Sequence, residues 1–234
     1  MDKTSLGDRM KQYERNHKYY LIKKVPVIVR IDGRAFHSLK LDKPYDLNFY
    51  EVMKVVAKGL LEQVQNCKLA YSQSDEISLL LFDNAGPRTE CFFDNNIQKI
   101  VSITASIAAA RFNKTCYYND WWPLPKTKDI VFDSRVFNMP IHEVENYFIW
   151  RQQDATRNSI QMLGRAHFSH KELHKKNVND IQDMLMLQKD INWNDTQTYF
   201  KRGWCITKNG LDEEIPIFTQ DRNYIRKHLS AEEL

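Results

Sequence analysis

Apolar and polar residues alternate in short blocks along the first 140 residues. Runs of β-branched and aliphatic residues such as VPVIVRI are typical of buried strands, and apolar residues that recur every three or four positions predict helices. The predicted elements, in order, are a strand at 25–31, a helix at 47–65, strands at 69–71 and 77–82, a helix at 97–112 and a strand at 130–136.

This β-α-β-β-α-β order is that of the ferredoxin-like split unit and predicts an α+β fold. The sheet would be antiparallel, with its first and third strands adjacent at the centre, two helices on one face and the other face free for a ligand. After residue 140 the pattern predicts helices over 141–168 and 178–189, and 199–207 is compatible with a strand. We therefore expect one part over 1–140 and a mainly helical part over 141–234 packed on it.

Composition agrees with a globular protein, since 42% of the 234 residues are hydrophobic and 27% are charged. No apolar run approaches the ~18 residues of a membrane helix, and the charged start lacks a signal-peptide core. Four scattered cysteines suit reduced thiols. These features predict a cytoplasmic protein without a membrane partner.

The net charge is only +4, and residues 1–24 account for an excess of that size, with seven Lys or Arg against three Asp or Glu. Two readings stay open for this segment. It is a basic arm that contacts nucleic-acid phosphates, or the solvated side of an amphipathic helix.

Two aspartates stand where strands end. Asp32 follows the first strand, and Asp75 lies in the hairpin before the third. Because these strands are expected to be neighbours, the two carboxylates could form the oxygen-rich pair that Mg²⁺ favours. Two such ions, ~4 Å apart, activate an attacking oxygen and stabilise a leaving pyrophosphate. Either dipeptide alone, Asp32-Gly33 or Asp75-Glu76, is more often an ordinary turn, so the prediction depends on the strand order.

The residues after Asp32 add to this picture. Gly33 allows close approach of a ligand to the backbone and can lend a carbonyl oxygen to a metal ion. The next four residues could present backbone N–H groups to a triphosphate, as an anion nest does. They are Arg34, Ala35, Phe36 and His37.

Three motifs carry a resemblance to a known family. The stretches VIVRIDGRAFHSL, DKPYD and AYSQSDEISLLLF follow one another in this order. They are similar to the R-[IL]-D-G-R-x-F-H, K-P-x-D and Y-x-Q-S-D-E-x-S hallmarks of the tRNA-histidine guanylyltransferase superfamily. Weaker similarity continues through FDSRVF, WRQQDATRNS and KRGW, so that the resemblance covers about residues 5–208.

The resemblance implies a fold like the palm of polymerases and 3′-to-5′ nucleotide addition at the 5′ end of tRNA. It also implies ATP, GTP or other nucleoside triphosphates as substrates, two Mg²⁺ ions and a homotetramer. Asp32, the Gly33 carbonyl and Asp75 would hold the metal ions, with Glu76 as a further catalytic carboxylate.

The resemblance also assigns the other site residues. Those that would hold the triphosphate are Asp32, Gly33, Arg34, Ala35, Phe36, His37, Lys43, Asp46, Ser74 and Asp75. Those that would contact triphosphate or RNA phosphates are Lys99, Arg135 and Asn158.

Two departures indicate a branch of that superfamily. Eukaryotic histidine-tRNA enzymes have D-C-H-I-N-N, where this chain has DATRNS with Thr156 in place of the histidine, and Asn158 is kept. A basic cluster before the second predicted helix is replaced by DNN at 94–96. Both changes resemble the guanylyltransferase-like branch, which implies template-directed repair of truncated tRNA 5′ ends.

Two other functions are compatible with this element order. A cyclic-nucleotide or cyclic-dinucleotide synthase also uses a palm with an acidic hairpin, but its usual G-G-D-E-F is SQSDE here. A non-catalytic RNA-binding module shares β-α-β-β-α-β, yet it needs exposed aromatics where this chain has ISLLLF.

Overall fold

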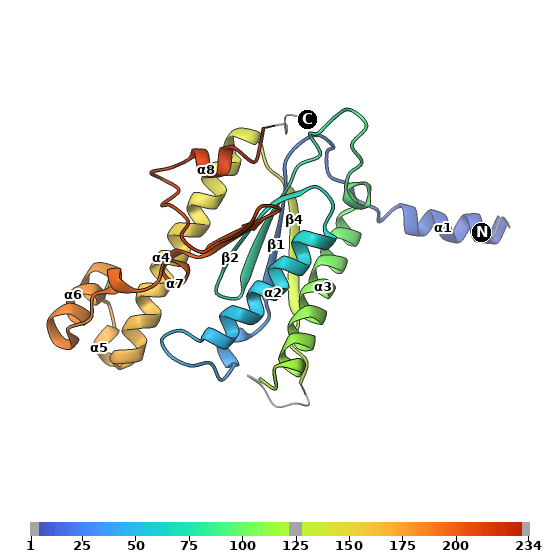
Figure 1. The fold of residues 1–234 in the computed structure, drawn as a ribbon. Coiled ribbons are helices and arrows are strands. Elements are labelled where there is room, and N and C mark those ends of the chain that lie inside the picture. The colour runs from blue at the N-terminus through green and yellow to red at the C-terminus, as the bar shows by residue number, and fades with distance from the viewer. Residues whose placement is uncertain (1–4, 122–127, 231–234) are drawn as a thin grey trace.

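A computed structural model describes residues 5–121 and 128–230 of the chain (Figure 1). Within these residues, six strands form one antiparallel sheet in the order β4-β1-β3-β2-β5-β6. The predicted α+β series is confirmed. It consists of β1 (Val27–Gly33), α2 (Leu47–Gln63), β2 (Cys67–Gln73), β3 (Glu76–Leu81), α3 (Ile97–Tyr118) and β4 (Phe132–Asn138).

The strand order places the two acidic motifs side by side. Strand β1 lies between β3 and β4, and Asp32 is opposite Glu76 on β3 and opposite Asp133 on β4. The adjacency of the first and third strands, on which the metal prediction depends, is therefore confirmed.

Helices α2 and α3 cover one face of the sheet. Side chains of β1 such as Val29 and Ile31 point to this face and pack with Leu60 of α2 and Phe112 of α3, all of them buried. Both helices begin at a side-chain cap, because Asp46 accepts the N–H of Phe49 and Asn96 accepts that of Lys99.

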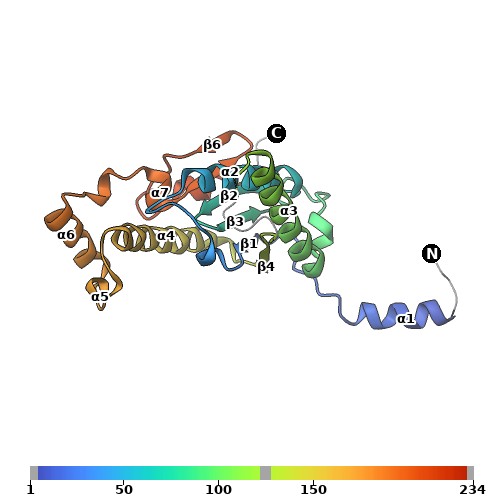
Figure 2. The same ribbon diagram turned by 90° about the horizontal axis from the view of Figure 1, so that it is seen from below.

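The prediction that the other face is free for a ligand is wrong. Helix α4 (Val144–His167) lies across it, on the side opposite α2 (Figure 2). Ile28 and Leu80 of the sheet are buried there with Phe148 of α4 and Phe218 of the C-terminal segment. The strands β1 and β3 are apolar at successive positions, so both of their faces need a cover.

The chain after residue 140 adds helices and also extends the sheet. Its remaining elements are α5 (His170–Leu173), α6 (Val178–Lys189), α7 (Thr198–Arg202), β5 (Trp204–Thr207), β6 (Gly210–Asp212) and α8 (Asn223–Arg226). A strand over all of 199–207 is wrong, because α7 occupies the first part and Gly203, with φ 82°, separates it from β5. The division of the chain at residue 140 stays a prediction.

Helix α1 (Ser5–Arg15) extends away from the rest of the molecule (Figure 1), and none of its residues is buried. The basic N-terminal segment is thus helical in part. Among the residues that the structure describes, no helix has the length and apolar character needed to span a bilayer.

Candidate active site

The turn after β1 is built around Gly33 and Phe36. A Cβ atom on Gly33 would lie 2.3 Å from the ring of Phe36, so no larger residue fits without moving that ring. Phe36 is buried against Phe49, Phe112 and Phe132, with ring centroids 5.2 to 5.7 Å away. The aromatic cluster fixes the turn, and the backbone between Gly33 and Phe36 is left at the surface of a cavity.

Backbone N–H groups in this turn are suited to an anion. Ala35 has φ 59° and ψ 30°, in the left-handed region, and precedes the 3₁₀ turn η1 (Phe36–Ser38). The N–H groups of Gly33 and Arg34 donate to Asp75 and Val131, whereas the described residues provide no acceptor for those of Ala35, Phe36 and His37. A left-handed residue followed by a helical one forms a nest that binds phosphate oxygens.

The β2–β3 hairpin presents the second carboxylate. Ser74 has φ 50°, a conformation that costs a non-glycine residue about 1 kcal/mol or more and that is often found at functional sites. The N–H of Gly33 donates to the carbonyl of Asp75 at 3.1 Å, which joins the hairpin to the β1 turn. Burial and the negative charge of Asp32 raise the pKa of Asp75 to about 6.

A cavity of about 540 Å³ opens between the β1 turn, the hairpin and α4. This volume is in the usual range for small-molecule sites. Most of the site residues predicted from the sequence line it, namely Asp32, Gly33, Ala35, Phe36, His37, Ser74, Asp75, Glu76 and Asn158.

The donor set fits a divalent cation. Asp32 and Asp75 share the cavity, and burial and the charge of Asp32 raise the pKa of Asp75, so a cation bound between the two carboxylates would relieve their repulsion. The described residues contain no cluster of three or more His, Cys, Asp and Glu side chains around one point. A metal ion here would therefore bind two carboxylates, with backbone and substrate oxygens completing its coordination.

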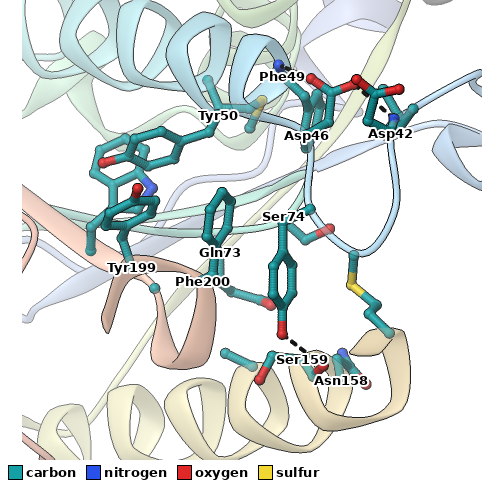
Figure 3. A pocket seen from close by; sticks show the side chains of 17 residues that line it. Asp42, Asp46, Phe49, Tyr50, Gln73, Ser74, Asn158, Ser159, Tyr199 and Phe200 are labelled. Carbon is teal, nitrogen blue, oxygen red and sulfur yellow. Dashed lines mark hydrogen bonds between the residues drawn. The ribbon is translucent and has the colours of Figure 1, made fainter. Parts of the chain in front are cut away.

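A second pocket of about 100 Å³ adjoins the cavity and is mainly apolar (Figure 3). Gln73, Ser74 and Asn158 line both spaces. Two ring stacks form its wall, Tyr45 on Phe200 at 4.6 Å and Tyr50 on Tyr199 at 4.4 Å between centroids.

Asp46 lines this second pocket, but its carboxylate is already bonded. One oxygen accepts the N–H of Phe49 and the other that of Asp42, each at 2.9 Å. Asp46 therefore shapes the pocket and caps α2, and its predicted contact with the nucleotide stays a prediction.

Four other predicted residues lie outside both spaces. Arg34 and Lys43 are exposed near the β1 turn and the loop before α2. Arg135 on β4 approaches Asp32 to 3.8 Å while pairing with Asp133 at 3.3 Å. Lys99 is in the first turn of α3, at the end of the sheet away from Asp32, so its contact with phosphates stays a prediction.

The helix wall of the cavity was largely missed from the sequence. Arg151, Asp154, Asn158 and Arg165 of α4 line it, although only Asn158 was predicted. Their spacing of three, four and seven residues places them on one helix face, which is a readable signal. Arg30, also missed, is the one charged residue inside the apolar run of β1.

Comparison with known proteins gives the family. The family model described as tRNAHis guanylyltransferase matches residues 7–140. The chain belongs to this family. Over 221 residues it is 29% identical to the tRNA(His) guanylyltransferase of Debaryomyces hansenii, covering 85% of this chain and 78% of that protein.

Solved structures of bacterial tRNA(His) guanylyltransferase (Thg1)-like proteins agree with this membership. One in complex with ATP has a TM-score of 0.92 and 43% identity, covering 96% of this chain and 99% of that one. Another in complex with GTP has a TM-score of 0.81 and 38% identity over the same shares. The palm-like fold implied by the three motifs is thus confirmed.

Proposed function

We propose that this chain is a nucleotidyltransferase that adds nucleotides in the 3′-to-5′ direction to the 5′ end of tRNA. The observation that carries the proposal is the cavity that Asp32 and Asp75 line together with the turn at residues 35–37. Support comes from the relatives, which are named tRNA(His) guanylyltransferases, and from the bacterial relatives bound to ATP and to GTP.

The reaction has two transfers. The 5′-monophosphate of the RNA attacks the α-phosphate of ATP or GTP and releases pyrophosphate. The 3′-hydroxyl of an incoming nucleoside triphosphate then attacks the activated 5′-phosphate and releases the nucleoside monophosphate. In both steps an anionic phosphate must be held in line with the attacking oxygen.

The residues of the chain would act mainly by binding and orientation. Asp32, the Gly33 carbonyl and Asp75 would hold two Mg²⁺ ions, which lower the pKa of bound hydroxyls and stabilise the charge that develops on phosphate oxygens. The backbone N–H groups of Ala35, Phe36 and His37 would bind the triphosphate oxygens. No side chain in the cavity is then needed as a general base.

The choice of the added nucleotide would come from base pairing with the tRNA. Thr156 of α4 stands where eukaryotic histidine-tRNA enzymes have a histidine, so a strong demand for that tRNA or for G is not expected. A site that reads the backbone and shape of a base pair copies the opposing base instead.

Four variants of a tRNA that lacks its first nucleotide test this proposal, each with a different base opposite the gap. The protein is incubated with Mg²⁺, ATP and labelled nucleotides, and the 5′ ends are sequenced. Addition that follows the opposing base in all four is the expected result. Addition of G whatever the opposing base, and only to histidine tRNA, would contradict template direction while leaving nucleotidyl transfer in place.

A cytoplasmic homotetramer is part of the same proposal. Helix α1 exposes Leu6, Met10 and Tyr13 at helical spacing without burying any of its residues, and such an apolar stripe is usually covered in an assembly. Sedimentation equilibrium of the purified protein, which gives its mass in solution, checks this part.

A further inference from the structure

Glu76 is next to Asp75 in the sequence, but its carboxylate is held by two arginines. Arg151 of α4 donates from Nε to Oε1 at 2.7 Å and from Nη2 to Oε2 at 2.9 Å. Arg30 of β1 approaches Oε2 to 2.8 Å. Glu76 is 4% exposed and Arg151 is 3% exposed, so the pair is shielded from water.

Each arginine also contacts a second carboxylate at the cavity. Nη2 of Arg30 lies 3.4 Å from Oδ2 of Asp32, and Nη2 of Arg151 donates to Oδ2 of Asp154 at 2.9 Å. The guanidinium of Arg151 further lies over the ring of Trp150, at 4.4 Å from its centroid. Glu76 thus connects β1, the hairpin and α4 at the base of the cavity.

We infer that Glu76 and Arg151 are positioning residues: their two-pronged ion pair fixes the hairpin that carries Asp75 against α4, and Glu76 is not itself a metal ligand. This replaces the catalytic role expected of Glu76 from its sequence position. The inference rests on the proposed function, because it concerns the same cavity.

The geometry favours positioning over metal binding. Both oxygens of Glu76 already accept charged donors, so a metal ion bound to either oxygen would lie beside a guanidinium that repels it. Asp75, in contrast, has no arginine partner among the described residues, so its carboxylate oxygens are left for a cation.

A purely structural ion pair is the alternative. Breaking a buried pair lowers stability whatever the pair does for catalysis, so loss of activity in an unfolded variant decides nothing. The variants must therefore keep the fold, and the readouts must separate metal binding from turnover.

Three variants of the full chain make this separation: Glu76→Gln, Arg151→Lys and Asp75→Asn. Binding of Mn²⁺ to each is measured by electron paramagnetic resonance without nucleotide, and kcat and KM for the triphosphate are measured with Mg²⁺ and truncated tRNA. Thermal melting confirms that each variant is folded. The matched control is Arg226→Lys, since Arg226 makes the same two-pronged pair with Glu145 of α4, at 2.8 and 3.1 Å, away from the cavity.

Arg151→Lys keeps the positive charge but loses the two parallel hydrogen bonds that the guanidinium donates to Glu76. We therefore expect kcat to fall about 10-fold or more, with KM for the triphosphate nearly unchanged. For Glu76→Gln we expect a similar loss of kcat with Mn²⁺ affinity changed less than about threefold, whereas Asp75→Asn should weaken Mn²⁺ binding more than about 10-fold. Arg226→Lys should leave both measurements at the wild-type level.

Two results would overturn the inference. If Arg151→Lys is folded and has the kcat of the wild type, the ion pair between Glu76 and Arg151 contributes to stability and not to catalysis. Weakening of Mn²⁺ binding by Glu76→Gln to the level of Asp75→Asn would make Glu76 a ligand. A wild-type protein that binds Mn²⁺ but transfers no nucleotide would instead contradict the proposed function, and the Mn²⁺ comparison between Glu76→Gln and Asp75→Asn would still decide the role of Glu76.

Discussion

The two walls of the cavity treat negative charge in opposite ways. On the sheet wall, Asp32 and Asp75 are placed by strand ends and by backbone hydrogen bonds. Asp32 lies 3.4 Å from Arg30, whereas Asp75 has no cationic partner among the described residues. At the junction with the helix wall, Glu76 and Asp154 both accept hydrogen bonds from the guanidinium of Arg151, and Glu76 is also paired with Arg30. Burial raises the pKa of Glu76, and the arginines oppose that rise.

This difference indicates how the site divides its tasks. An uncompensated, partly buried carboxylate is costly for the protein alone and becomes favourable when a cation binds. A compensated carboxylate has little affinity left for a cation and contributes to geometry instead. Asp75 and Glu76 are neighbours in the sequence, but they take different roles because Glu76 is paired with two arginines and Asp75 with none among the described residues.

The largest effect is expected from removal of a sheet-wall carboxylate. Asp32→Asn and Asp75→Asn should each lower kcat by about 10³-fold or more, because each would remove a proposed ligand of the metal ions with almost no change in volume. Single-turnover nucleotide addition to truncated tRNA measures this loss. Asp133→Asn is the control, since Asp133 is opposite Asp32 on β4 but exposed and paired with Arg135. Near-normal turnover in either cavity variant would remove the basis for the metal assignment.

The next prediction uses the raised pKa of Asp75 and requires metal-free protein. Its folded pKa, about 6, is above the ordinary 3.8, so the folded state holds the proton more tightly than the unfolded state. Stability from this group is fully present below pH ~4 and is lost as the pH rises through about 6. Asp75→Asn should thus match the wild type near pH 4 and exceed its free energy of unfolding by about 1–3 kcal/mol at pH 8.

Urea unfolding with a chelator present, between pH 4 and pH 8, measures this difference. Glu76→Gln sharpens the comparison, because loss of the charged carboxylate leaves the buried guanidinium of Arg151 unpaired and should lower stability at pH 8. If Asp75→Asn and Glu76→Gln changed stability in the same direction at pH 8, the two walls would not differ as described.

The sheet wall could be predicted from the sequence for a physical reason. Strand order follows from the order of the elements, and a carboxylate at a strand end is fixed by backbone geometry that the sequence pattern already specifies. Asp32, Gly33 and Asp75 accordingly lie together at one cavity. The strained turn at Ser74 and the cavity position of Arg30 are features that the pattern did not reveal.

The helix wall and the C-terminal segment were harder to predict because tertiary contacts define them. Arg151 on α4 belongs to the site only because α4 crosses the second face of the sheet. The segment after Asn209 has little periodicity, yet Ile215, Phe218 and Ile225 complete the core on that face. Single apolar residues in irregular segments give no periodic signal, so their burial follows from the fold and not from local spacing.

The smallest predicted effect concerns the outer part of the helix wall. Arg165 lines the cavity, and the described residues offer it no ion-pair partner, whereas Arg157 on the same helix is exposed and paired with Asp154. Arg165→Ala should raise KM for the triphosphate or for the tRNA about 3- to 10-fold with little change in kcat, since it removes one cation from the cavity proposed to bind phosphates. Steady-state kinetics at two salt concentrations measure this change, which should shrink as salt screens the contact. Arg157→Ala, the control, should leave KM unaltered, because Arg157 does not line the cavity and its charge is already paired with Asp154. Equal changes in both variants would show that the helix wall acts by its overall charge and not through a residue directed at the substrate.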